Sequence, residues 1–479
     1  MVALPLITAF LLPVIGRISM AAARWTGPLV LLASLAVGVS AWLQLGSGAV
    51  SLELGGFRPP MGIVLYVDRL ALLFAIAVTG GTLLLWPRNG MGLRPYTLSL
   101  LLAASGSGLA LSGDLFNIYV FYELVAVVSY GLAVSGRTPA AFAATIRYLV
   151  ISGFGAALAL AGIALVYDAT GTLNLAQLAQ LAPEKLNGLQ GLSAFVLLLI
   201  GIGVKAELFP VNTWVPEIYA TAPKRVSALL AGLISKLALV VILRLVVLIF
   251  PLPEAHTLML VLGILGVLTG ELAAWRARDL PRVLAYSSIG QLGIMFIAFS
   301  VPGEAGVFAG LAVALHHLLV KPALFLLAER WSGALTNLAG AARVSPLGAA
   351  LFVLFSLSLL GIPPLPGFWA KLLVLTSLAQ AGGALHYGGA AAIMLGMVLE
   401  ASYLFRIIAR MYQAPVPAGA PAAHGRLDLA TSSLLGVGLI AAVFLLAPLA
   451  DRLQGIAAET ADVDHYIETV NPVSNRNPL

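Results

Sequence analysis

Residues 192–216 read LSAFVLLLIGIGVKAELFPVNTWVP, an apolar segment that contains charged residues and prolines. A helix of about 20 apolar residues spans a bilayer, whereas proline removes a backbone donor and interrupts a helix. Lys205 and Glu207 precede Pro210, and Pro216 ends the segment. The segment therefore predicts a broken transmembrane helix with buried charges beside the break.

The composition of the whole chain excludes a water-soluble globular protein. Of its 479 residues 60% are hydrophobic and only 10% are charged, with a mean hydropathy of +1.01, whereas soluble domains are about a quarter charged. Because there is no cysteine, we expect no disulfide, iron–sulfur cluster or other cofactor, and any redox chemistry falls to a partner. No Lys/Arg run is interleaved with aromatic residues, so the formal charge of +6 does not indicate nucleic-acid binding.

Apolar stretches recur along the chain and predict an all-α polytopic membrane protein. The first stretch has no charged n-region and no cleavage site, so we interpret it as a retained helix. The polar tail from Asp451 is expected to be bound at the surface or mobile. We predict fourteen transmembrane helices near residues 2–15, 27–45, 70–86, 96–111, 115–134, 143–167, 192–215, 226–250, 257–274, 283–300, 306–327, 346–373, 388–408 and 431–449.

Basic residues alternate between the connections and predict the orientation. The intervening connections hold little beyond Arg58, Arg69 and Lys185. Since Lys and Arg are retained in the cytoplasm, the odd-to-even connections lie inside and both termini lie on the outer face. The basic residues of those connections are Arg17, Arg24, Arg88, Arg94, Arg137, Lys224, Arg225, Arg276, Arg278, Arg282, Arg330, Arg343, Arg406, Arg410 and Arg426.

Charged landmarks recur at one spacing and predict an internal repeat. Five helices in each copy invert the second copy. We therefore expect helices 1–3 in residues 1–95, the two inverted repeats in 96–250 and 251–412, and the last helix with the tail in 413–479. The matched pairs are Asp114 and Asp279 (279 − 114 = 165), Lys205 and Lys371 (371 − 205 = 166), and Lys236 and Glu400 (400 − 236 = 164).

The seventh and twelfth predicted helices share a proline break beside a lysine. Pro210 and Pro216 interrupt the seventh, and Pro363 and Pro364 interrupt the twelfth ahead of Lys371. Proline kinks are common in membrane helices, but a break beside a buried lysine in both copies favours a hydrated ion path.

The lysines indicate proton transfer. Of six lysines, four lie inside predicted helices: Lys205, Lys236, Lys321 and Lys371. A buried ammonium can release its proton, whereas a guanidinium cannot. With Glu123 as the natural partner of Lys205, these residues predict a proton relay; the alternative for each lysine is a helix-end residue that reaches the headgroups.

Further ionisable residues extend this line. His317 and Lys321 are four residues apart and share a helix face, whereas His316 points about 100° away. A metal site is disfavoured, because no further ligand stands at the right spacing and Lys321 repels a cation. Glu400 either continues the relay or forms a structural ion pair with Arg406.

Six ordered motifs between residues 98 and 412 resemble the antiporter-like subunits shared by Mrp cation/proton antiporters, respiratory complex I and membrane-bound hydrogenases, with most similarity to the D-type Mrp subunit. The motifs are Asp114-Leu-Phe-Asn-Ile-Tyr-Val-Phe-Tyr-Glu123, Lys205 with Phe209-Pro210 and Trp214-Val-Pro216, Ser227-Ala-Leu-Leu-Ala-Gly232 before Lys236, Asp279-Leu280 before Leu284-Ala-Tyr-Ser-Ser-Ile289, His317 with Lys321 and Phe325, and Gly361-Ile-Pro-Pro364 through Gly367-Phe-Trp-Ala-Lys371.

The resemblance implies roles for these residues. Glu123 would tune Lys205, Lys236 would pass charge inward, His317 and Lys321 would bridge the repeats, and Lys371 would exchange with the opposite side. It implies a bacterial or archaeal cytoplasmic membrane, and as partners similar membrane subunits, protons, and Na⁺ or K⁺. Glu207 departs from the family pattern, which has a small or apolar residue there; we keep Glu207, His316, Asp114 and Asp279 as secondary candidates.

Three function classes follow. The first is a subunit of a multi-subunit monovalent cation/proton antiporter. The second is a proton-pumping module of a redox complex, in which partner subunits carry the electron chemistry; whether the assembly is an enzyme stays open. The third, a scaffold that transports nothing, is disfavoured because unused charges inside a membrane are costly.

Overall fold

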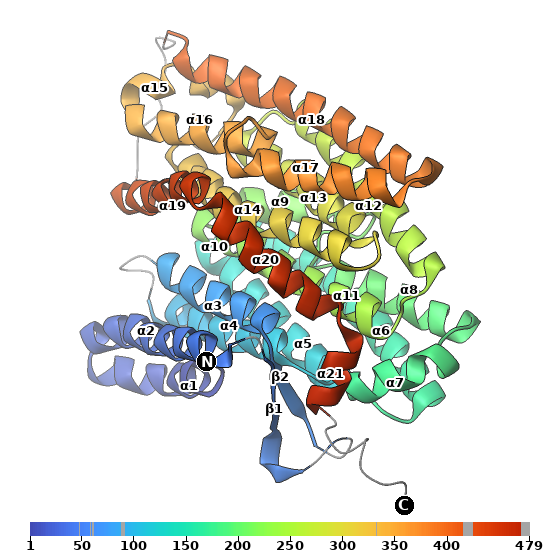
Figure 1. Ribbon diagram of the computed structural model, residues 1–479. Coiled ribbons are helices and arrows are strands. Elements are labelled where there is room, and N and C mark those ends of the chain that lie inside the picture. Colours follow the sequence, from blue (N-terminus) through green and yellow to red (C-terminus); the bar gives the residue numbers. More distant parts are fainter. Residues whose placement is uncertain are drawn as a thin grey trace, which may run out of the picture.

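The computed structural model describes residues 1–479 except 47, 58, 60–61, 88–91, 332, 415–424 and 471–479. It is a bundle of helices with one antiparallel hairpin (Figure 1). The helices and strands used below are α1 (Ala3–Ile18), α2 (Met20–Leu45), β1 (Val50–Glu53), β2 (Val64–Val67), α3 (Arg69–Leu84), α4 (Leu93–Leu111), α5 (Leu115–Ala133), α6 (Pro139–Thr170), α7 (Leu175–Lys185), α8 (Leu189–Gly203), α9 (Val215–Thr221), α10 (Lys224–Leu229), η3 (Leu230–Ile234), α11 (Ser235–Leu248), α12 (Pro253–Arg276), α13 (Leu280–Phe299), α14 (Glu304–Ala328), α15 (Ala341–Val344), α16 (Pro346–Leu360), α17 (Pro366–Ala381), α18 (Gly383–Tyr412), α19 (Arg426–Phe444), α20 (Leu446–Ala461) and α21 (Val463–Val470).

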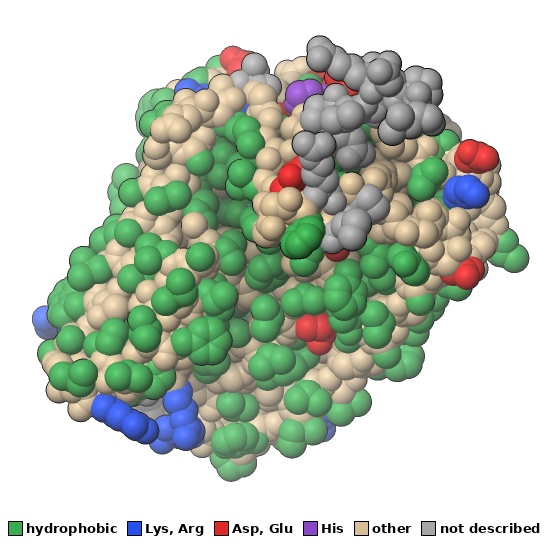
Figure 2. Space-filling view, turned by 90° about the horizontal axis from the view of Figure 1, so that it is seen from below, with side chains coloured by type: hydrophobic (Ala, Val, Ile, Leu, Met, Phe, Trp, Pro, Cys, Tyr) green, Lys and Arg blue, Asp and Glu red, His purple; other side chains and the backbone are tan. Residues whose placement is uncertain are grey.

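The all-helical membrane fold is confirmed. Each of the fourteen predicted stretches falls on one helix or on a pair of consecutive helices. Within the described residues, nine helices are long and apolar enough to cross a membrane by themselves, so the count of fourteen stays a prediction. Seen from below, hydrophobic side chains cover most of one face and Lys and Arg gather at an edge (Figure 2), as expected for a surface that contacts lipid.

The middle of the bundle is the continuous helix of α10, η3 and α11. The most apolar window of Lys224–Leu248 is 100% buried, and that of α13 is 89% buried. Glycines allow α12 to approach α13 closely: a Cβ on Gly270 would lie 2.6 Å from the backbone nitrogen of Gly290. Small residues permit such backbone contact between membrane helices. Charged groups on these helices are therefore removed from lipid.

The breaks in the seventh and twelfth predicted helices are confirmed, but the first begins earlier than its prolines. Helix α8 ends at Gly203 and α9 begins at Val215, so Lys205 and Glu207 lie in the break itself. Pro216 lies in the first turn of α9, where proline loses no hydrogen bond; it starts that helix and does not break one. The second break separates α16 from α17 and contains Pro363 and Pro364.

Two aspartates mark corresponding points of the expected repeats. Asp114 caps α5 by accepting a 2.9 Å hydrogen bond from the Asn117 nitrogen, and Asp279 caps α13 by accepting a 3.0 Å bond from Arg282. Both also form isolated β-bridges, to Asn174 and to Ala334. This local likeness supports the repeat, and it gives both aspartates a capping role.

The tail from Asp451 is helical over its described residues. Helix α20 crosses the bundle diagonally from α19 to α21, which lies near the hairpin (Figure 1). It packs along α14, and α21 contacts α7 and β1. The Ser51 hydroxyl donates to the Thr469 carbonyl over 3.2 Å. Of the two expected alternatives, residues 451–470 therefore take the first and are bound at the surface of the bundle, while 471–479, like Arg58 and Arg88, lie outside the described residues.

Candidate functional site

The predicted relay residues lie in the interior on five different helices and the first break. Each has a side chain that is almost removed from the surface, apart from Glu123, whose side chain is 32% exposed. The buried members are Lys205, Glu207, Lys236, His316, His317, Lys321, Lys371 and Glu400.

Glu123 and Lys205 meet at the first break. The Lys205 Nζ lies 4.0 Å from Glu123 Oε1, which is too far for a hydrogen bond but close enough for strong attraction. The same ammonium donates to the Ser152 hydroxyl over 3.1 Å and lies 3.4 Å from the centre of the Tyr122 ring. Lys205 thus has substitute partners that keep it in place when Glu123 moves.

Glu207, two residues after Lys205 in the first break, is buried in the bundle. Its φ of 57° is a left-handed conformation that side chains rarely adopt. One carboxylate oxygen accepts a 2.6 Å hydrogen bond from the Tyr219 hydroxyl, whereas Oε2 has no partner among the described residues. The basic groups that act on it are Lys236 and Lys321, so Glu207 lies within electrostatic reach of both lysines.

Lys236 follows a π-helical turn. Segment η3 has π geometry, and the Lys236 ammonium donates to the Ala231 carbonyl within it and to the Ser235 hydroxyl over 3.1 Å. A π-turn offsets the helical ladder and exposes carbonyl groups, and such turns are frequent at functional sites. The Lys236 ammonium is therefore stabilised by the dipoles of a carbonyl and a hydroxyl, and no carboxylate of the described residues forms an ion pair with it.

The two histidines have different surroundings. His316 contacts the Ser358 hydroxyl over 2.9 Å. The completely buried ring of His317 has no hydrogen-bond partner for either nitrogen among the described side chains and backbone. Lys321, one turn further, donates to the Leu284 carbonyl over 3.1 Å and to the Ser287 hydroxyl over 2.8 Å. Of the two histidines, His317 is the one whose ring nitrogens have no hydrogen-bond partner in the described part of the chain.

The second break leads to a paired lysine. Lys371 donates to Glu400 Oε2 over 2.7 Å, and Gln291 donates to the other oxygen over 3.0 Å. Arg406 instead donates to the Trp275 carbonyl. The alternative ion pair of Glu400 with Arg406 is therefore not formed, and the carboxylate belongs with the relay lysine.

Sequence analysis missed Glu271 on α12. This carboxylate is 2% exposed and accepts a 2.9 Å hydrogen bond from the Tyr403 hydroxyl. The available signal was the one used for Glu400, a lone carboxylate inside an apolar stretch. It also missed two buried ion pairs, Arg244 with Asp68 at 2.7 Å and Arg225 with Asp428 at 2.8 Å.

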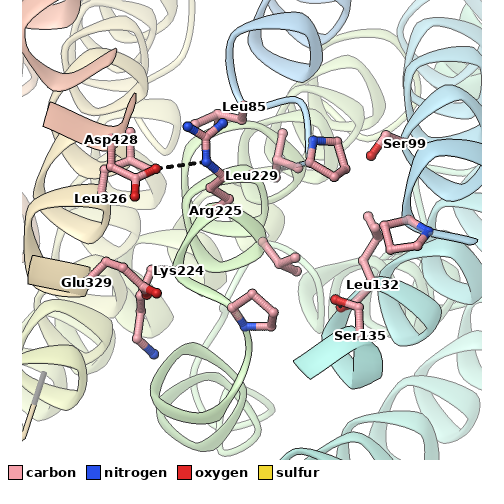
Figure 3. A pocket seen from close by; sticks show the side chains of 14 residues that line it. Leu85, Ser99, Leu132, Ser135, Lys224, Arg225, Leu229, Leu326, Glu329 and Asp428 are labelled. Atoms are coloured by element: carbon pink, nitrogen blue, oxygen red, sulfur yellow. Dashed lines mark hydrogen bonds and ion pairs between the residues drawn. The ribbon is translucent and has the colours of Figure 1, made fainter. Parts of the chain in front are cut away.

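A pocket of about 190 Å³ opens beside α10. Arg225 and Asp428 face each other on one side, Lys224 and Glu329 lie below them, and Ser135 lies on the opposite side (Figure 3). Lys224 also donates to three carbonyls at the end of α9, among them that of Ala220 over 2.6 Å. The pocket belongs to the side of the bundle that carries the basic connections.

Comparison with known families and curated proteins gives a consistent result. The family model described as NADH:quinone oxidoreductase/Mrp antiporter, TM, matches residues 112–396. The N-type subunit of NADH-quinone oxidoreductase from Desulforudis audaxviator is 32% identical, over 92% of this chain and 94% of the relative. The D-type subunit of the Na(+)/H(+) antiporter from Alkalihalophilus pseudofirmus is 34% identical, over 68% of this chain and 69% of the relative.

Solved structures of multi-subunit membrane complexes contain similar chains. One belongs to an archaeal membrane-bound sulfane sulfur reductase, with a TM-score of 0.91, 29% identity and 98% of both chains covered. Another belongs to the Mrp complex of a Dietzia species, with a TM-score of 0.90, 27% identity and 98% of both chains covered. A third belongs to respiratory complex I of Thermus thermophilus, with a TM-score of 0.81 and 28% identity; the match covers 95% of this chain and 99% of that chain.

Proposed function

Because the chain belongs to the NADH:quinone oxidoreductase/Mrp antiporter transmembrane family, we propose that it is the proton-translocating subunit of a multi-subunit monovalent cation/proton antiporter. The observation that carries the proposal is the buried row of ionisable side chains from Glu123 to Glu400. Isolated charges at this depth cost several kcal/mol each, about 3 on insertion scales, and a scaffold would have no use for them.

The Glu123–Lys205 pair is the switch of the relay. At 4.0 Å the carboxylate stabilises the ammonium, so a movement of Glu123 makes Lys205 a stronger proton donor. Glu123 lies on a face of α5 that also exposes Phe116, Val120 and Val127. A neighbouring subunit packed on this face would contact Glu123 directly, which couples the switch to the rest of the complex.

The inner residues pass the proton across the bundle. From Lys205 it moves to Lys236 through the region of Glu207, and then by way of His317 and Lys321 to Lys371. His317 suits this position because both ring nitrogens lack partners within the described residues. Lys371 releases its proton when the Glu400 carboxylate no longer stabilises its positive charge. It takes up a proton when the ion pair forms again.

The second candidate function is a proton-pumping membrane subunit of a redox complex. Its support is the similarity over 92% of the chain to an N-type subunit of NADH-quinone oxidoreductase and the likeness to a chain of complex I. In that case the same residues move protons and partner subunits supply the driving reaction.

We also propose the repeats at 96–250 and 251–412 and an outer location for both termini, in the cytoplasmic membrane of a bacterium or archaeon. The alternating basic connections support this orientation, and the pocket of Figure 3 is then the cytoplasmic mouth of the first repeat.

Transport in everted vesicles tests the function. Vesicles from antiporter-deficient bacteria that express the whole gene cluster receive Na⁺ or K⁺, and a pH dye reports proton movement. We expect a cation-induced change that Lys205→Ala and Glu123→Ala each abolish, while Lys185→Ala on the exposed end of α7 leaves it intact.

Each outcome assigns the function. A response to cations that depends on Lys205 establishes the antiporter. Acidification only after a redox substrate is added establishes the pump module. Transport at the parent rate in both the Lys205 and Glu123 variants contradicts either function.

A further inference from the structure

Two opposite charges in the second half of the bundle have no direct ionic partner among the residues that the structure describes. Lys371 and Glu400 neutralise each other at 2.7 Å. Lys321 contacts only a carbonyl and a hydroxyl, and Glu271 accepts only from a phenol. The charged groups that act on Glu271 are Glu400, Lys371 and Lys321. Since the first two are paired with each other, Lys321 is the remaining counter-charge for Glu271.

Ser287 and Tyr403 fill the space between these two charges. Lys321 donates to the Ser287 hydroxyl over 2.8 Å, and the Tyr403 hydroxyl donates to Glu271 Oε2 over 2.9 Å. Ser287 is also close enough to the Tyr403 hydroxyl to act on it, but no hydrogen bond joins the two hydroxyls in the described structure. Ser287 and Tyr403 are both completely buried, so no bulk water competes for these bonds.

The donors in this series all point the same way. Ser287 accepts from the ammonium, so its single hydrogen is available to Tyr403, whose own hydrogen is directed at the carboxylate. Once a small side-chain rotation brings Ser287 Oγ into contact with the Tyr403 hydroxyl, the series can conduct a proton by exchange of bonds. The direction runs from Lys321 to Glu271.

The geometry points to Glu271 as a further proton-binding residue, reached from Lys321 through Ser287 and Tyr403; we name this series the Glu271 branch. In one transfer, the Lys321 proton passes to Ser287 Oγ, the Ser287 proton to the Tyr403 oxygen, and the Tyr403 proton to Glu271 Oε2. An ammonium and a carboxylate become a neutral amine and a neutral carboxylic acid. The low-dielectric interior favours this product, because two separated charges disappear.

The packing of α12 against α13 leaves room for this carboxyl group. A side chain on Gly290 would overlap Glu271 Oε1. Glu271 lies five residues before Arg276, where α12 ends, and the adjoining connection borders a hollow of about 540 Å³ lined by Arg276, Arg278 and Arg406. The branch therefore leads toward the connection between the end of α12 and the start of α13. Lys371, in contrast, lies on the path through the second break.

This inference rests on the proposed function, and vesicle transport tests both. In the complete complex, Glu271→Gln keeps the size and the bond from Tyr403 but cannot take up the proton, so transport falls about tenfold or more. Tyr403→Phe removes the intermediate hydroxyl and slows transport several-fold, and the double variant is no slower than Glu271→Gln. Two controls keep the parent rate: Glu184→Gln on the surface of α7, and Tyr466→Phe, whose hydroxyl has no partner among the described groups.

Infrared spectroscopy supplies a readout that does not depend on transport. On acidification, the parent complex shows the carbonyl stretch of a buried carboxylic acid, which is absent in Glu271→Gln and shifted in Tyr403→Phe. An unchanged carbonyl stretch in an assembled Glu271→Gln complex, or transport at the parent rate in either variant, overturns the inference. If Glu271→Gln does not assemble, Tyr403→Phe decides alone. If Lys205→Ala also transports normally, the proposed function fails; if only the Glu271 and Tyr403 variants do, the branch alone fails.

Discussion

At the scale of single residues, the proposed relay consists of charges that differ in how fully they are neutralised. Lys371 has a carboxylate at 2.7 Å, Lys205 has one at 4.0 Å, and Lys236 has only dipoles in contact. A fully paired charge is held firmly and a poorly paired one gives up its proton easily. The graded pairing thus orders the lysines as donors along one path.

Removing one member of the tightest pair gives a prediction for stability. Glu400→Leu leaves the Lys371 ammonium buried without a counter-charge, which costs about 3–5 kcal/mol, so the purified complex should unfold at a lower temperature. Adding Lys371→Met to Glu400→Leu should recover most of that temperature, because both charges are then gone, while transport stays absent. Unfolding of Glu400→Leu at the parent temperature would contradict a tight pair.

The sequence was informative about most, though not all, of the residues at which a charge interrupts an apolar run. Lys205, Lys236, Lys321, Lys371 and Glu400 were found in this manner, and all are buried. It could not reveal which carboxylate serves which lysine, because those contacts join helices far apart in the chain. For that reason the sequence left Glu400 with two alternatives, the relay or an ion pair with Arg406. The surroundings of Glu271, with a hydrogen bond from Tyr403 and the nearby charge of Lys371, are visible only in the structure.

At the scale of elements, apolar length predicted the spanning helices, while shorter elements gave no such signal. Helix α7, the hairpin and α20 to α21 combine polar and apolar residues and gain their structure from the bundle they contact. The first break was predicted at its prolines, yet α8 already ends at Gly203. Glycine has a low helix propensity, and beyond it the ammonium of Lys205 is held by Ser152 on α6.

Helix α20 carries a pH-dependent contact outside the spanning helices. Burial and the neighbouring Asp68 raise the pKa of Glu459 to about 7 from the ordinary value of 4.5. The folded state thus binds this proton more tightly than the unfolded state, so the docking of α20 is strongest below pH 4.5 and weakens as the pH rises through about 7. Since solvent screens the half-exposed carboxylate, we expect a loss of about 1 kcal/mol.

Hydrogen exchange checks this docking. After correction for the intrinsic effect of pH, amides of α20 should exchange several-fold faster at pH 8 than at pH 5, and Glu459→Gln should remove the difference. Equal protection of α20 at both pH values in the parent protein would show that Glu459 does not control the contact.

At the scale of the whole molecule, the two halves are similar in plan and different in detail. Each half has an aspartate cap, a broken helix and a lysine at the break. In the first half the lysine pairs with Glu123, which is partly exposed on an outer face of α5; in the second half it pairs with Glu400 in the interior. The pair proposed as the switch is therefore accessible to a neighbouring subunit, whereas the pair at the other end of the proposed path is closed off in the interior.

The orientation of this path is testable because the chain contains no cysteine, so any introduced thiol is unique. Arg137 lies between α5 and α6, Lys185 ends α7, and both side chains are exposed. If the basic connections are cytoplasmic, an impermeant thiol reagent added to intact cells should label Lys185→Cys and leave Arg137→Cys unlabelled, and everted vesicles should give the reverse. The opposite pattern would place both termini in the cytoplasm and would turn the pocket beside Lys224 into an outer opening.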